Sequence, residues 1–146
     1  MIEEVLPGPI GLDTAIFIYF IEEHPDYLGI LDPLFQAVDR GVLQCVTSAI
    51  TLLETLVVPY RAGDTALAER YEELLTRSAG VRLVELDRGL LKAAAHLRGR
   101  LCLRTPDALQ IAAALAAGCT KYLTNDRRLP AIPRLSVLQL DDYRSV

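Results

Sequence analysis

Four acidic residues occupy positions where a parallel sheet would gather them at one edge. Two come just after short stretches that resemble strands, namely Asp13 and Asp126, and two belong to predicted helices, namely Glu54 and Asp107. Hard divalent cations such as Mg²⁺ and Mn²⁺ prefer carboxylate oxygens and water, and they keep coordination positions open for a substrate phosphate. Cations held in this way activate water for in-line attack on a phosphodiester. The four acids together therefore predict metal-dependent hydrolysis of a phosphodiester.

Each acid also has an ordinary structural explanation when it is considered alone. Asp13 can cap the helix that follows it, and Asp107 can complement a helix dipole from the first turn. Glu54 fits a solvated helix face, and Asn125-Asp126 is a common turn sequence. The metal hypothesis therefore depends on the four acids converging where parallel strands end, which is where open α/β sheets bind their ligands.

The stretch from Thr105 to Asp126 places two of these acids at the two ends of one helix-strand unit. Thr105 is a predicted N-cap, Pro106 suits the first helical position, and Gly118 provides a left-handed stop. The helix between them is apolar almost all round, so we expect it to lie between the sheet and other helices. A strand at 122–124 then brings Asp126 to its carboxyl end.

The rest of the chain alternates between short strands and helices. Further strands are expected at 10–12, 42–46, 81–86 and 135–140. The first expected helix covers 15–23, and the second runs from Asp32-Pro33 to Gly41. A third follows a cap at Thr47 or Ser48 and ends or kinks near Val58, before Pro59. A fourth and a fifth begin at the caps Asp64 and Asp87. Strands separated by helices pair in parallel through right-handed crossovers. The predicted fold is a three-layer α/β/α sandwich with a parallel central sheet, in one domain over residues 1–146.

Composition indicates a cytoplasmic protein. Half of the 146 residues are apolar, yet no apolar run approaches the ~18 residues of a membrane span. The N-terminal MIEEVLPG is acidic and unlike a signal peptide. Three cysteines without CxxC spacing argue against a disulfide framework or a zinc site, so we expect reduced, buried thiols at Cys45, Cys102 and Cys119.

The charge distribution is more informative than the net charge of −4, which argues mildly against binding nucleic acid through overall charge. Most bases follow residue 40. Four side chains recur every four residues and form one line on a predicted helix: Arg88, Lys92, His96 and Arg100. The line is either a solvated helix face or a track for phosphates that leads towards Asp107.

Two motifs are specific enough to carry a family resemblance. TPDALQIAAAL contains a D-A-x-x-x-A-x-A helix that starts at Asp107, and LTND contains a T-N-D turn that ends at Asp126. At these residues the chain resembles the PIN-domain nucleases, and within them the VapC toxins of toxin-antitoxin pairs. The early Asp of the family falls on Asp13 in GLDTAIFIYF, and its helical Glu falls on Glu54 in TLLETL.

This resemblance implies a Mg²⁺- or Mn²⁺-dependent endoribonuclease that is a homodimer and is silenced by a cognate antitoxin. The implied metal ligands and catalytic residues are Asp13, Glu54, Asp107 and Asp126, and the implied supporting residues are Thr124 or Asn125. The candidate RNA-binding residues beside them are Arg88, Lys92, Arg100 and Arg127.

Two alternatives remain open at the level of the sequence. The first alternative is a receiver-like binding domain, which also carries acids at the carboxyl edge of a doubly wound sheet. That resemblance would require an acidic pair after the first strand and a Lys after the fifth. Here Thr14 follows Asp13, and neither Lys92 nor Lys121 is suitably placed. The second alternative is a PIN fold that only binds and does not cleave.

Overall fold

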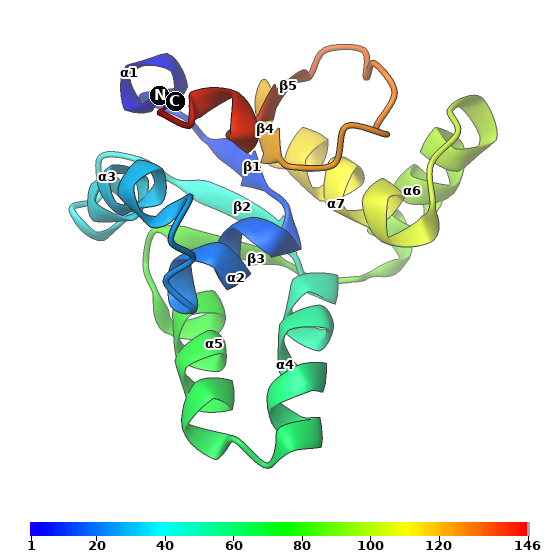
Figure 1. Cartoon of the computed structure of the whole chain (residues 1–146). Helices are drawn as coiled ribbons and strands as arrows, with labels where there is room; N and C mark the ends of the chain where they lie inside the picture. The colour runs from blue at the N-terminus through cyan, green and yellow to red at the C-terminus, as the bar shows by residue number, and fades with distance from the viewer. Residues whose placement is uncertain (146) are drawn as a thin grey trace.

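A single parallel sheet forms the centre of the molecule. The computed structural model describes residues 1–145. Its strands lie in the order β3-β2-β1-β4-β5 and are Ile10–Leu12 (β1), Cys45–Ser48 (β2), Val81–Val84 (β3), Lys121–Thr124 (β4) and Ser136–Gln139 (β5) (Figure 1). Every pair is parallel, and Gly11 of β1 is in register with Val46 on one side and Tyr122 on the other. The expected α/β class with a parallel sheet is confirmed.

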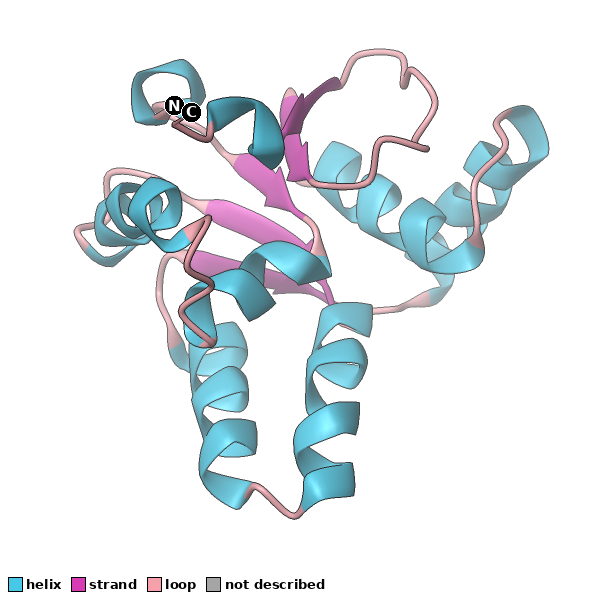
Figure 2. Ribbon diagram, viewed as in Figure 1, coloured by secondary structure: helices cyan, strands magenta, loops and turns pink. Residues whose placement is uncertain are grey.

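Helices cover both faces of this sheet, as Figure 2 shows. Their bounds are Ile2–Val5 (α1), Thr14–Ile21 (α2), Leu28–Asp39 (α3), Ile50–Ala62 (α4), Thr65–Arg77 (α5), Arg88–Arg100 (α6) and Thr105–Ala116 (α7), and a short 3₁₀ helix covers Leu140–Tyr143 (η1). One core cluster joins α2, α3 and the end of α5 to one face, and a second joins α6 and α7 to the other. The three-layer sandwich is confirmed. α4 and α5 form a hairpin that extends away from the sheet (Figure 1).

α7 lies directly on the central strand. The residues from Ala108 to Ala114 are all buried, including the polar Gln110, as its apolar circumference predicts. Gly11 permits this close approach, because a Cβ there would lie 2.7 Å from Tyr122 Cδ1 and 2.8 Å from Ala114 Cβ. Gly118 has a φ of +82° and ends the helix region as expected.

Two helices pass through prolines that were expected to limit them. α3 begins at Leu28 rather than after Asp32, because Leu31 is fully buried and continues the apolar face of the helix towards its N-terminus. α4 continues through Pro59 to a cap at Gly63 instead of ending near Val58. Apolar packing of α4 against α2 and α5 stabilises this continuation despite the missing N–H.

Smaller differences concern caps and strand ends. α4 begins after Ala49 rather than after Thr47 or Ser48, because both of those residues still belong to β2. Arg104, not Thr105, precedes the first turn of α7. Strands β2 and β3 are displaced or shorter than expected, at 45–48 and 81–84, and β5 is limited to 136–139.

The cysteines are free, but they are not all buried. Cys45 and Cys119 lie in the core, and burial raises the pKa of Cys45 to about 12 and that of Cys119 to about 11. Cys102 is exposed on the loop between α6 and α7, so its expected burial is wrong. Within residues 1–145, the helices are too short or too polar to cross a membrane.

Candidate functional site

The four predicted acids line one cavity at the carboxyl edge of the sheet. Asp13 directly follows β1, Glu54 lies in α4, Asp107 lies in the first turn of α7, and Asp126 follows β4. The cavity has a volume of about 390 Å³, and the four acids share its lining with Thr14, Ala15, Ile18, Arg104, Pro106 and Gln110. Parallel pairing places the carboxyl ends of β1 and β4 side by side, so acids that are far apart in the sequence meet here.

Thr124 joins the two acids that follow strands. Its hydroxyl donates a 2.6 Å hydrogen bond to Asp13 Oδ2 and accepts one of 3.1 Å from the backbone N–H of Asp126. Asp13 also caps α2, since its Oδ1 accepts from the N–H of Thr14 at 2.8 Å. The cap explanation and the site explanation of Asp13 are therefore compatible, because each uses a different carboxylate oxygen.

Asn125 faces away from the acids. Its Oδ1 accepts a 2.9 Å hydrogen bond from the backbone N–H of Asp141 in η1. Of the two candidate supporting residues, Thr124 contacts a predicted metal ligand, whereas Asn125 connects the turn after β4 to η1.

A buried amide lies beneath Glu54. Gln110 is 2% exposed, and its Nε2 donates to the hydroxyls of Thr14 at 3.0 Å and Thr51 at 2.7 Å. Its Oε1 accepts from the backbone N–H of Ser48 at 3.0 Å and lies 3.2 Å from the hydroxyl of Thr47. One side chain of α7 thereby connects α2, β2 and α4, which satisfies the amide in the core.

The hydroxyl protons in this network point towards Glu54. Thr14 donates its single hydroxyl proton to Glu54 Oε1 at 2.7 Å, because an ionised carboxylate only accepts. The 3.1 Å contact between Thr14 and Thr51 then requires the proton of Thr51. The 2.7 Å contact between Thr51 and Thr47 draws in turn on the proton of Thr47, which is shared with Gln110 Oε1 at 3.2 Å. The resulting chain of donors holds Glu54 in one orientation, and each bond polarises the next.

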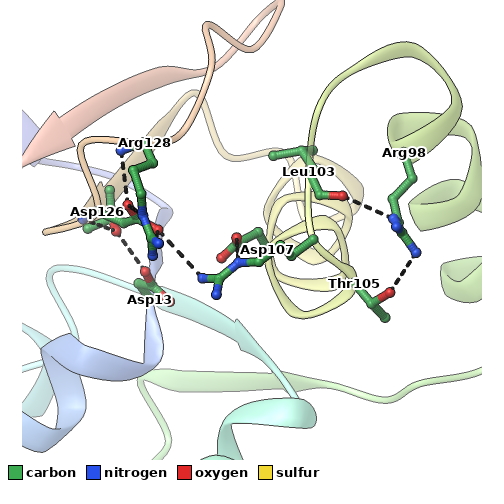
Figure 3. A network of polar contacts seen from close by, with 9 residues as sticks. Asp13, Arg98, Leu103, Thr105, Asp107, Asp126 and Arg128 are labelled. Atoms are coloured by element: carbon green, nitrogen blue, oxygen red, sulfur yellow. Dashed lines mark hydrogen bonds and ion pairs between the residues drawn. The ribbon is translucent and has the colours of Figure 1, made fainter.

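Two arginines pair with the remaining acids. Arg128 binds Asp126 with both branches of its guanidinium group, from Nε to Oδ1 at 2.9 Å and from the terminal nitrogen to Oδ2 at 3.2 Å (Figure 3). Arg104 lies between two carboxylates, 3.4 Å from Asp107 Oδ2 and 3.8 Å from Asp126 Oδ2. Neither arginine was among the predicted site residues, although each is within three positions of an acid in the sequence.

The donor set fits a hard cation, but the acids are engaged with other partners. Within residues 1–145, no group of three or more His, Cys, Asp or Glu side chains is arranged to hold a metal ion. In this arrangement guanidinium groups bind Asp107 and Asp126, while hydroxyls bind Asp13 and Glu54. Four carboxylates on one cavity remain the ligand type that Mg²⁺ and Mn²⁺ prefer.

The electrostatic surroundings of the acids differ. Burial raises the pKa of Asp13 above its usual value, and the negative charges of Asp107 and Glu54 raise it further, against the hydrogen bonds from Thr124 and Thr14. The hydrogen bond from Arg128 lowers the pKa of Asp126. The site therefore contains one acid whose charge is disfavoured and one whose charge is compensated.

The predicted RNA-binding residues lie on other parts of the surface. Arg88, Lys92 and Arg100 are exposed on α6 as expected, and Lys92 and Arg100 flank a shallow groove over Ala95. Arg127 forms a 2.5 Å ion pair with the exposed Asp142. Arg128 and Arg104, rather than Arg127, therefore contact the acids directly.

Several solved structures that are similar to this chain come from toxin-antitoxin systems. VapBC2 from Rickettsia felis bound to promoter DNA has a TM-score of 0.68 at 18% identity, covering 90% of this chain and 98% of that chain. A toxin-antitoxin complex from Klebsiella pneumoniae has a TM-score of 0.66 at 18% identity, covering 91% and 98%. VapC20 from Mycobacterium tuberculosis, a toxin that cleaves the sarcin-ricin loop, has a TM-score of 0.62 at 18% identity, covering 77% and 86%.

These likenesses establish the fold, and the family follows from the sequence. Curated proteins give no match to this chain by sequence. A family model described as the PIN domain matches residues 10–135, a range that contains all four acids and both motifs around Asp107 and Asp126. The chain belongs to the PIN domain family.

Proposed function

We propose that the protein is a Mg²⁺- or Mn²⁺-dependent endoribonuclease and the toxin of a toxin-antitoxin pair. The observation that carries this proposal is the cavity on which Asp13, Glu54, Asp107 and Asp126 meet at the carboxyl edge of the sheet. Membership of the PIN domain family and structural likeness to VapC toxins support it.

The four acids would hold the cation, which when bound activates water and stabilises the leaving oxygen of the phosphodiester. The chain's own residues prepare the ligands for that role. Thr124 fixes one oxygen of Asp13, and the chain of hydroxyls above Gln110 fixes one oxygen of Glu54. Holding ligands in advance lowers the entropic cost of forming the loaded site.

The biological setting is part of the same proposal. The relatives of similar fold include complexes of toxin with antitoxin, which supports a cognate antitoxin as the protein partner. We further propose a homodimer in the cytoplasm that uses RNA as its substrate. The exposed line on α6 and Arg127 are the proposed secondary contacts to the RNA backbone.

An RNA cleavage assay with a matched variant tests this proposal. The purified protein should cut RNA with Mn²⁺ or Mg²⁺ and lose that activity in excess EDTA. Asp107→Asn should lower turnover by orders of magnitude, because Asn keeps the shape but loses the charge that a hard cation needs. The matched control is Asp64→Asn, which removes one negative charge from the N-cap of α5. Because Asn caps a helix as well as Asp does, this variant should cut RNA at the wild-type rate.

The assay also separates the alternative of a PIN fold that only binds. Cleavage that persists in EDTA, or that is equal in Asp107→Asn and the wild type, would assign the activity to another site or to a contaminant. A wild-type protein that binds Mn²⁺ and RNA without cutting would be a binding domain.

A further inference from the structure

Arg104 and Arg128 differ from the other bases of the chain because they contact the acids of the candidate site. Both side chains are well exposed, at 67% and 76%, whereas their partner Asp126 is only 17% exposed. Arg104 also reaches Asp107, which is 15% exposed. Two flexible cations from the solvent side thus cover two sheltered carboxylates.

The chain aims Arg104 at this position. Arg98 on α6 donates from Nε to the carbonyl of Leu103 at 3.0 Å and from a terminal nitrogen to the hydroxyl of Thr105 at 2.8 Å (Figure 3). These bonds hold Leu103 and Thr105, the residues on either side of Arg104. The guanidinium group of Arg104 is thereby directed towards Asp107 and Asp126.

Arg128 is held in a comparable way by its own turn. Its backbone N–H donates to Asp126 Oδ1 at 2.9 Å, and its side chain returns to the same carboxylate. Gln139 of β5 donates to the carbonyl of Asp126 at 3.2 Å and anchors this turn to the sheet. Both arginines therefore contact Asp126, Arg104 from the loop before α7 and Arg128 from the turn after β4.

A guanidinium group and a divalent cation compete for the same carboxylate oxygens. Ion pairs as exposed as these contribute little free energy, so a divalent cation can displace them. A displaced guanidinium fork matches a phosphate as well as it matches a carboxylate. A cleft of about 140 Å³ beside the acid cavity contains both arginines and is further lined by Cys102, Leu103, Asp107, Asp126 and Leu129.

We propose that Arg104 and Arg128 exchange partners when the site is loaded. In the metal-free protein they neutralise Asp107 and Asp126, and in the loaded protein they bind a phosphate of the RNA in the adjoining cleft. They would position the substrate, and in the absence of metal they pair with two of the proposed metal ligands. This inference rests on the proposed ribonuclease function.

The exchange predicts opposite effects on metal and on RNA. Without RNA, Arg104→Gln and Arg128→Gln should each bind Mn²⁺ about twofold to fivefold more tightly in calorimetric titration, the range expected when an exposed ion pair no longer competes. In cleavage assays at saturating Mn²⁺, the same variants should raise KM for a short single-stranded RNA about tenfold with a smaller change in kcat, because a charge-assisted bond to phosphate is lost.

Two further variants make the test specific. Arg128→Lys keeps the charge but loses the fork, so it should bind Mn²⁺ with near-native affinity and still raise KM. Arg77→Gln removes one charge at the opposite edge of the sheet, where Arg77 has no ion-pair partner within residues 1–145, and should change neither quantity. Thermal unfolding in EDTA verifies that each variant is folded.

The outcomes separate this inference from the proposed function. Native Mn²⁺ affinity and native KM in Arg104→Gln and Arg128→Gln, with a wild type that cleaves RNA, would overturn the exchange alone. Weaker Mn²⁺ binding in these variants would also overturn it, because the arginines would then only support the fold. A wild type that neither binds Mn²⁺ nor cuts RNA would overturn the proposed function and the inference with it.

Discussion

The hydroxyl of Thr124 donates a 2.6 Å hydrogen bond to Asp13 Oδ2 across the junction of β4 and β1. The same hydroxyl accepts from the N–H of Asp126 at 3.1 Å, so it connects the two acids that follow the paired central strands. Because Thr124 is fully buried, water does not replace either bond when the hydroxyl is removed.

Thr124→Val should therefore destabilise the metal-free protein by about 1–3 kcal/mol, the usual cost of leaving buried polar groups without partners. It should also weaken Mn²⁺ binding, because Asp13 loses the bond that orients it. Urea unfolding and calorimetric titration measure the two effects. Thr124→Ser keeps the hydroxyl and should retain most of the Mn²⁺ affinity; an equal loss in both variants would assign the effect to packing.

Gln110 gives a second prediction, because four polar contacts depend on one side chain. Gln110→Met keeps the length but leaves buried donors and acceptors unpaired, so the free energy of unfolding should fall by about 3 kcal/mol. Mn²⁺ affinity should fall as well, since Thr14, which donates to Glu54, loses the bond from Gln110 that helps to orient its hydroxyl. Gln36→Met on the exposed face of α3 is the matched control. Unchanged Mn²⁺ affinity in Gln110→Met would limit the network to a structural role.

A third prediction concerns pH in the metal-free protein. The pKa of Asp13 is raised on folding, chiefly by burial, so the folded state binds the proton more tightly than the unfolded state. The stabilisation from this residue is therefore present below its unfolded pKa and is lost as pH rises through the folded pKa. Asp126 acts in the opposite sense, because its lowered pKa gives stability that is lost as pH falls.

Asp13→Asn isolates the first effect, since Asn caps a helix as well as Asp does. In EDTA near pH 7 the variant should be more stable than the wild type, and this advantage should shrink on acidification as the wild-type carboxyl takes up its proton. Denaturant unfolding at several pH values measures the difference. A variant that is less stable than the wild type at every pH would mean that the bonds of Asp13 to Thr124 and Thr14 outweigh its buried charge.

The line on α6 gives a fourth prediction. Replacing Arg88, Lys92 and Arg100 together by Gln should weaken RNA binding and reduce the slope of log affinity against log salt by about 2, since each lost phosphate contact removes a counterion-release contribution. The control carries the same charge change at exposed positions elsewhere, on Arg40, Arg61 and Arg77. Equal slopes in the two triple variants would make the α6 line an ordinary solvated face.

The convergence of the acids was predictable because it follows from backbone topology. Strand-helix alternation implies a parallel sheet, and a parallel sheet brings Asp13 and Asp126 to one edge whatever their side chains do. The sequence places Arg104 and Arg128 near the acids, as bases that could hold a polyanion beside them. Their ion pairs with Asp107 and Asp126 were not predictable, because these depend on the side-chain conformations that the α6–α7 loop and the turn after β4 impose.

The mistaken helix ends have a different cause. Pro33 and Pro59 are local signals, and both were overridden by burial that only the assembled fold provides, at Leu31 in α3 and at Leu56 in α4. Cys102 was expected in the core because cysteine is commonly buried, whereas the loop that carries it is held on the surface by Arg98.

The strand order has a consequence for how such a site can be silenced. β1 is the central strand, paired with β2 on one side and β4 on the other, and the N–H of Asp13 continues this ladder to the carbonyl of Leu123. We expect amides in such a position to be among the slowest of the fold to exchange with solvent. Opening the edge at Asp13 would therefore require the neighbouring strands of the sheet to open with it. The antitoxin proposed above would then act by covering or filling the cavity, and the protein that it releases would be ready to work without refolding.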